Sequence, residues 1–256
     1  VWQDSRAGGG QKDIYAQHID SSGILQWATN GIMVCAATGT QGLWINWRAN
    51  SIIPDGAGGA IICWYDLRGG MDYDVYAQRL NAAGIGQWTT NGVAVCTAIS
   101  EQYAPSLISD DMNGAILTWH DRRNGTNYDI YAQRINAAGL VQWTANGVAI
   151  CTAIAEQEPP SIVSDGLNGA IITWEDARTN FADIYAQRIN ALGIVQWVAD
   201  GVAICTASGY QRVPMIIPNG LGGAYIAWDD SRNGVNYDIY AQLVNAAGVA
   251  QWTTDG

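Results

Sequence analysis

The chain has 256 residues, including thirty Gly, twelve Trp and twelve Tyr, and it carries a net charge of −11. This composition is typical of an all-β protein with many tight turns, and the length allows a substantial core. The acidic balance, with Lys12 as the one lysine, excludes the basic surface that nucleic-acid binding requires. No apolar run approaches the roughly 20 residues of a membrane-spanning helix, so membrane insertion is not expected.

Three short motifs recur along the chain in a fixed order. The motif Trp-x-Asp-x-Arg places repeated aspartates at Asp4, Asp66, Asp121, Asp176 and Asp230. The motif Asp-Ile-Tyr-Ala-Gln follows at Asp13, Asp74 (with Val in place of Ile), Asp129, Asp183 and Asp238. Gln-Trp pairs then give Trp27, Trp88, Trp143, Trp197 and Trp252, spaced by 61, 55, 54 and 55 residues. This period predicts one repeat domain over residues 1–256, with copies near 1–31, 32–92, 93–147, 148–201 and 202–256.

Each full copy predicts four strands separated by turn signals. In the fourth copy the predicted strands are residues 161–164, 170–174, 183–189 and 194–197. The segment 170–174 is nearly all apolar, which indicates burial on both faces. Small sheets that bury their faces against one another are propeller blades, so we expect a β-propeller of about five four-stranded blades. An open or linear β-repeat array is the alternative.

The two ends of the chain leave the repeat unbalanced. The chain begins at the end of a second strand and stops before a further first strand, so the first blade is predicted to be incomplete. An unpaired strand edge favours strand addition by another chain. We therefore expect protein partners, above all copies of the same chain, with glycans as a further candidate and no nucleic acid.

One non-repetitive insertion, residues 42–48, separates the first two copies. It is unusually aromatic, and Trp44, Trp47 and Arg48 have the composition of an interaction hot spot. These three residues are the candidate binding residues. A plug that covers a blade edge or a pocket is an equally weighted alternative.

The combined pattern resembles a repeat found in secreted bacterial multidomain proteins, and more distantly the sialidase-type propellers that carry Asp-box turns. In those propellers a Ser-x-Asp-x-Gly-x-Thr-Trp turn joins the third and fourth strands of a blade. Here residues 20–23 before Trp27 and residues 81–84 before Trp88 take the corresponding place, although the spacing to Trp is one residue longer. The resemblance implies the propeller architecture only.

Sialidase activity would need an arginine cluster, a Tyr–Glu nucleophile pair and an acidic Asp, but arginines such as Arg79, Arg134 and Arg188 keep the repeat symmetry. Glycoside hydrolysis needs two carboxyl groups with opposed roles. Glu101, Glu156 and Glu158 fall in predicted linking segments, and Glu175 lies beside a repeat aspartate, so no asymmetric pair is evident. No catalytic residue and no cofactor are expected.

The repeated residues have a structural interpretation that outweighs a functional one. Aspartates of Trp-x-Asp-x-Arg could form a ring of ligands, but bonding to turn amides or to the Arg two positions on is favoured. The repeated Trp could stack on sugars, but packing between blades is favoured. His18 and His120 occupy ordinary strand positions, and no CxxC or Cys/His grouping suggests a metal.

Cys96, Cys151, Cys205 and Cys35 recur at one repeat position, where a small buried apolar residue is the favoured interpretation. A Cys35–Cys63 bridge is the one disulfide considered. These features together predict a non-enzymatic structural or interaction module, extracellular or on the cell surface, that self-assembles through its incomplete blade. A lectin-like carbohydrate-binding propeller is the alternative, followed by a sialidase-like glycoside hydrolase.

Overall fold

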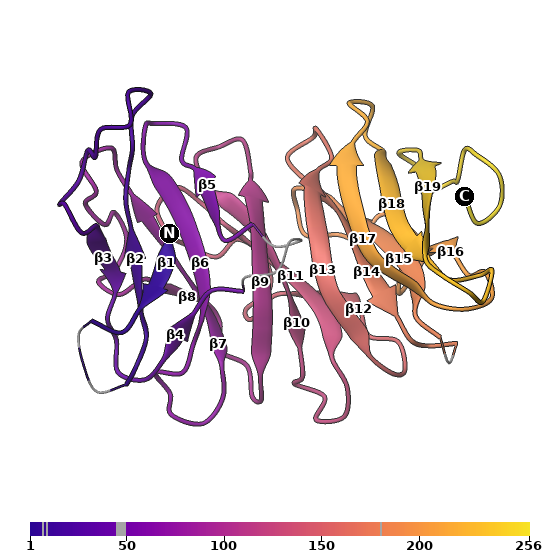
Figure 1. Cartoon of the computed structure of the whole chain (residues 1–256), viewed down its shortest axis with the longest axis horizontal. Coiled ribbons are helices and arrows are strands. Elements are labelled where there is room, and N and C mark those ends of the chain that lie inside the picture. The colour runs from indigo at the N-terminus through magenta and orange to yellow at the C-terminus, as the bar shows by residue number, and fades with distance from the viewer. Residues whose placement is uncertain (7, 9, 45–49, 180) are drawn as a thin grey trace.

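The computed structural model describes residues 1–6, 8, 10–44, 50–179 and 181–256, and every regular element in these ranges is a strand (Figure 1). Sheet 1 contains β1 (Trp2–Asp4), β2 (Asp13–Ala16) and β3 (Ile32–Cys35). Sheet 2 contains β4 (Gln41–Gly42), β5 (Ile52–Pro54), β6 (Ala60–Asp66), β7 (Asp74–Leu80) and β8 (Val93–Cys96). Sheet 3 contains β9 (Gln102–Ser109), β10 (Ala115–Asp121), β11 (Asp129–Ile135) and β12 (Val148–Cys151). Sheet 4 contains β13 (Gln157–Ser164), β14 (Ala170–Asp176), β15 (Asp183–Ile189) and β16 (Val202–Cys205). Sheet 5 contains β17 (Gln211–Pro218), β18 (Ala224–Asp230) and β19 (Asp238–Val244).

Consecutive sheets pack face to face, and the core lies between them. Four clusters of buried hydrophobic side chains join sheets 1 and 2, 2 and 3, 3 and 4, and 4 and 5. Because side chains alternate along a strand, β14 sends Trp174 toward sheet 3 and Ile171 toward sheet 5, and both are fully buried. The first strands β9, β13 and β17 lie beside one another. The predicted all-β propeller fold is confirmed.

Sheets 1 and 5 each have three strands. Within the described residues, sheet 1 has no first strand, as predicted, and sheet 5 has no fourth strand, which was not predicted. The far face of sheet 5 is uncovered, since Ile239 is 74% exposed whereas its counterpart Ile184 is fully buried. Among the described residues, no buried hydrophobic cluster joins sheet 5 to sheet 1.

The fourth strand of each blade was predicted wrongly. Residues 194–197 form only an isolated bridge, Ile189 to Val195, and the fourth strand is β16. Trp197 is turned toward sheet 5 instead, because its backbone N–H donates to Gln187 Oε1 (3.0 Å) and its indole N–H to the Ala246 carbonyl (3.1 Å). The sheets therefore run across the predicted copy boundaries. The β16 position ends in a repeated Cys, and all five cysteines are buried and free.

The first strands are irregular at one end of the molecule, where β9, β13 and β17 each have a register shift against the second strand. The register between β13 and β14 shifts between Glu158 and Ser161, where Pro159 and Pro160 cannot donate ladder hydrogen bonds. In sheet 2 two short strands, β4 and β5, take the place of one first strand, and both pair with β6. A bulge changes the direction of the side chains next to it, so the side chains at this end do not follow the regular alternation of the strands.

Candidate functional site

One repeat position differs in every sheet although its neighbours are the same. It is the middle residue of Trp-x-Asp, occupied by Gln3, Tyr65, His120, Glu175 and Asp229. The residues directly opposite on the first strands also differ, giving the pairs Gly42–Tyr65, Tyr103–His120, Glu158–Glu175 and Arg212–Asp229. This end of the sheets therefore breaks the symmetry that the rest of the repeat keeps.

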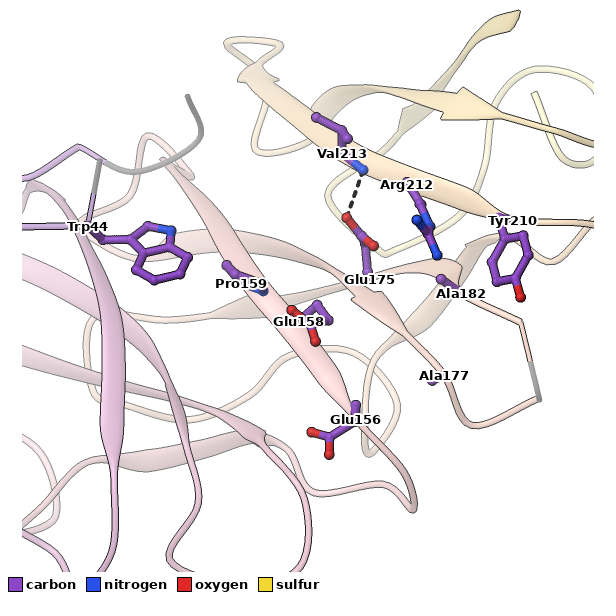
Figure 2. A pocket seen from close by; sticks show the side chains of 10 residues that line it. All are labelled: Trp44, Glu156, Glu158, Pro159, Glu175, Ala177, Ala182, Tyr210, Arg212 and Val213. Atoms are coloured by element: carbon purple, nitrogen blue, oxygen red, sulfur yellow. Dashed lines mark hydrogen bonds between the residues drawn. The ribbon is translucent and has the colours of Figure 1, made fainter. Parts of the chain in front are cut away.

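A pocket of about 510 Å³ opens at this end, between sheets 4 and 5 (Figure 2). It is lined by Trp44, Glu156, Glu158, Pro159, Glu175, Ala177, Ala182, Tyr210, Arg212 and Val213. Three of the four glutamates of the chain are in this set. In Figure 2 the Trp44 ring and the Tyr210 ring stand on opposite sides of the glutamates. The pocket thus combines carboxylates, one guanidinium and two aromatic walls.

Glu175 is the fixed member of the acidic group. Its side chain is buried, and its Oε1 accepts a hydrogen bond from the Val213 backbone N–H at 2.9 Å (Figure 2). Val213 has a φ of 56°, a strained conformation for a β-branched residue. The bond to Glu175 helps to hold this strained turn of β17, so sheet 5 orients a carboxylate of sheet 4.

Glu158 faces Glu175 across the β13–β14 ladder and is exposed. Directly opposed side chains in an antiparallel pair have Cβ atoms about 5 Å apart, so the two carboxyl groups share one side of the pocket. Arg212 brings a positive charge from sheet 5, and its guanidinium lies over the Tyr210 ring at 4.6 Å. The arrangement can exchange protons, accept hydrogen bonds from hydroxyl groups and stack on flat apolar faces.

Beside the pocket lies a group of rings that we name the aromatic strip: Tyr65, Tyr73, Tyr103, His120 and Tyr128. Its rings lie 4.4 Å apart between Tyr65 and Tyr103, and 4.4 Å apart between His120 and Tyr128. Trp44 joins it to the pocket, since the Trp44 ring is 4.9 Å from Tyr103 and 6.1 Å from His120.

Burial and neighbouring groups keep this strip uncharged. Burial lowers the pKa of His120 to about 3, so the imidazole is neutral near pH 7. Burial, together with a hydrogen bond to Glu101, raises the pKa of Tyr128 to about 12. Burial likewise raises the pKa values of Tyr65 and Tyr73. Tyr65, Tyr73, His120 and Tyr128 therefore present a neutral surface next to an acidic pocket.

The repeated aspartates do not line the pocket. Asp121 Oδ2 accepts hydrogen bonds from Trp119 Nε1 (2.8 Å) and from Arg123 (2.5 Å). Equivalent bonds to the Trp and Arg of the same motif are made by Asp4, Asp66, Asp176 and Asp230. These contacts belong to the framework that every sheet repeats.

The repeated Gln-Trp residues lie at the borders between sheets. The indole N–H groups of Trp27, Trp88, Trp143 and Trp197 each donate to a turn carbonyl of the next sheet. Trp252, which has no following sheet, is 50% exposed. Of the candidate binding residues, Trp44 lines the pocket, whereas Trp47 and Arg48 lie outside the described residues.

The prediction that no asymmetric pair of carboxyl groups is present is wrong. Glu156 lies in the segment before β13, as predicted, but Glu158 does not belong to a linker, because β13 begins at Gln157 and carries Glu158 onto the ladder opposite Glu175. A signal was present in the sequence, since the residue between the repeated Trp and Asp changes from copy to copy. This variable position stands between two residues that are the same in every copy.

Neither metal ligands nor a membrane span were found in the described ranges. No group of three or more His, Cys, Asp or Glu side chains there could hold a metal ion. None of the described elements is a helix long and apolar enough to cross a membrane.

No protein-family model matches the chain, and no curated protein matches it. Solved structures do share its fold. A protein of unknown function from Dyadobacter fermentans is 10% identical with a TM-score of 0.54, over 96% of this chain and 73% of that one. The polysaccharide lyase Uly1 is 10% identical with a TM-score of 0.52, over 86% and 57%. An endo-arabinase from Bacteroides thetaiotaomicron is 14% identical with a TM-score of 0.43, over 80% and 75%.

The chain is thus a β-propeller, and it shares this fold with the polysaccharide lyase Uly1. The prediction of a non-enzymatic structural module that self-assembles, and with it the prediction that the chain is no enzyme, is therefore corrected. Its premise was that the arginines keep the repeat symmetry and that no asymmetric pair of carboxyl groups is present. The pocket contradicts that premise, because Glu158, Glu175 and Arg212 occupy positions that differ in every sheet.

Proposed function

We propose that this chain is a carbohydrate-active propeller that binds a saccharide in the acidic pocket and hydrolyses a glycosidic bond there. The observation that carries the proposal is the face-to-face pair Glu158 and Glu175 in a pocket walled by Trp44 and Tyr210. Two carboxyl groups flanking the scissile bond are the usual requirement of glycoside hydrolysis. Among the described residues this is the one pair of directly opposed glutamates, and it lies where the symmetry of the repeat is broken.

The surroundings of the two glutamates suggest different roles. Glu175 is held by the Val213 N–H, so it suits the role that demands fixed position, attack on the anomeric carbon or activation of a water molecule. Glu158 is exposed and can exchange protons with solvent, so it suits protonation of the leaving oxygen. Arg212 can donate hydrogen bonds to sugar hydroxyls, and the rings of Trp44 and Tyr210 can contact the apolar faces of sugar rings.

An extracellular location belongs to the same proposal, because polymeric glycans are too large to enter a cell intact. A lectin-like binding site without turnover is the second candidate. The hydrogen bond from the Val213 N–H supports this second candidate, because a Glu175 side chain that stabilises the fold need not take part in catalysis.

The test is release of reducing ends from uncharged polysaccharides and from fluorogenic glycosides, with binding measured by calorimetry. We expect turnover by the unaltered chain and a loss of at least about 100-fold in kcat for Glu158→Gln and Glu175→Gln, the usual size of an acid–base contribution. Asp111→Asn is the matched control, since it removes one carboxylate from an exposed turn outside the pocket.

Three results would change this conclusion. Undiminished turnover in both glutamine variants would overturn the assignment of the pair. Saccharide binding without turnover would replace hydrolysis by the lectin-like function. Neither binding nor turnover across the panel would overturn the proposed function altogether.

A further inference from the structure

The aromatic strip and the acidic pocket occupy equivalent places in the repeat. Tyr103 and His120 of sheet 3 take the same repeat positions as Glu158 and Glu175 of sheet 4. Both sites therefore lie at the same end of the sheets. Trp44 contacts the strip and lines the pocket, so the two surfaces are continuous.

We propose that the aromatic strip is a subsite for the apolar faces of sugar rings, contiguous with the pocket, so that the ligand is an uncharged glycan long enough to reach both. This inference rests on the proposed function and names its substrate class. A monosaccharide would fill the pocket alone, whereas a chain of several sugar units would extend past Trp44 onto the tyrosines.

The strip has the chemistry that such a ligand needs. Tyr65, Tyr73, Tyr103 and Tyr128 are all partly exposed, so part of each ring and hydroxyl group can contact a ligand. Tyr73 lies in the loop before β7, with its ring 5.0 Å from Tyr65 and 5.4 Å from Tyr103. Binding sites for small ligands commonly combine aromatic walls with a few polar groups in this way.

Charge disfavours polyanionic glycans. The pocket holds three glutamates against Arg212. At the edge of the strip Glu101 accepts a hydrogen bond from the Tyr128 hydroxyl, and Arg122 lies over the Tyr128 ring at 5.4 Å. The whole chain carries a net charge of −11. The pocket glutamates and this net charge would repel a polymer of uronates or sulfated sugars, whereas an uncharged glycan meets no such repulsion.

His120 gives a second indication that this surface is built for binding. It is 5% exposed, lies between the rings of Tyr103 and Tyr128, and neither of its ring nitrogens has a hydrogen-bond partner within the described part of the chain. Burying unpaired polar atoms costs stability. Locally unfavourable choices of this kind concentrate at functional sites.

The test compares ligand length. Binding of arabino-, xylo-, manno- and fructo-oligosaccharides of two to six units is measured by calorimetry with Glu158→Gln as the background, so that cleavage during the titration is slow. Tyr73→Ala should weaken binding of the six-unit ligand about tenfold and leave the two-unit ligand unchanged, while Tyr73→Phe should lose less than threefold. Tyr237→Ala is the matched control, because Tyr237 takes the same repeat position in sheet 5 and lies outside the strip.

The outcomes separate this inference from the proposed function. Equal losses of affinity for short and long ligands, or no loss of affinity, would overturn the assignment of the strip as a subsite and would leave the function proposed for the pocket unaffected. Absence of all saccharide binding and cleavage by the unaltered chain would overturn both. Circular dichroism shows whether Tyr73→Ala folds, and Tyr128→Ala, on the other side of His120, gives the same length-dependent test if it does not.

Discussion

Asp74 allows a sharp test of the electrostatics, because it opens β7 directly opposite the fully buried Asp66. Burial, followed by repulsion from Asp66 and Asp72, raises the pKa of Asp74 to about 6, and Arg68 opposes the rise. A raised pKa means that the folded state prefers the protonated carboxyl. The stability contributed by this group is therefore complete below pH 4 and is lost as the pH rises through 6.

The substitution Asp74→Asn should remove this decrease in the free energy of unfolding at high pH, because an amide does not ionise. The rise above the ordinary pKa of an aspartate corresponds to at most about 3 kcal/mol, and solvent screening of a half-exposed carboxyl reduces this to about 1 kcal/mol. We expect the variant to be about 1 kcal/mol more stable than the unaltered chain at pH 7.5 and equally stable at pH 4. Urea unfolding followed by tryptophan fluorescence at both pH values measures the difference, with Asp111→Asn as control. A difference that stays constant with pH, or a destabilised variant at pH 7.5, would refute the reasoning.

The other predictions concern His120 and the repeated tryptophans. Burial lowers the pKa of His120 to about 3, so below pH 6.5 the unfolded chain binds a proton at this residue and the folded chain does not. The free energy of unfolding therefore falls as the pH decreases toward 3. His120→Phe should flatten this decrease in urea unfolding, and an unchanged pH profile would contradict the burial. Trp143→Ala should cost about 3–5 kcal/mol and Trp252→Ala only about 1 kcal/mol, since the two side chains are 9% and 50% exposed. Equal losses in thermal unfolding would show that the far face of sheet 5 is covered in solution.

The fold could be predicted because the residues that form it repeat. The apolar segment 170–174 lies within β14, and the predicted third strand coincides with β15. The fourth strand could not be placed from local pattern, because Trp197 is drawn toward sheet 5 by a hydrogen bond to Ala246, a contact distant in sequence. Tertiary contacts of this kind override strand propensity.

The candidate site was the harder part, for a related reason. A comparison of the copies emphasises what they share, and the shared Trp, Asp and Arg make the framework contacts. Glu158 and Glu175 are 17 positions apart, and only the register of β13 on β14 places them opposite each other. A two-residue irregularity at Pro159 and Pro160 sets that register near the pocket, and such a bulge is difficult to locate from the sequence alone.

The most direct measurement of the central claim is a crystal structure of Glu158→Gln with an uncharged six-unit oligosaccharide that the unaltered chain cleaves. We expect a sugar ring beside Glu175, between Trp44 and Tyr210, with further units over Tyr103 and Tyr73. A saccharide bound at the repeated Trp and Asp residues, with an empty pocket, would contradict it.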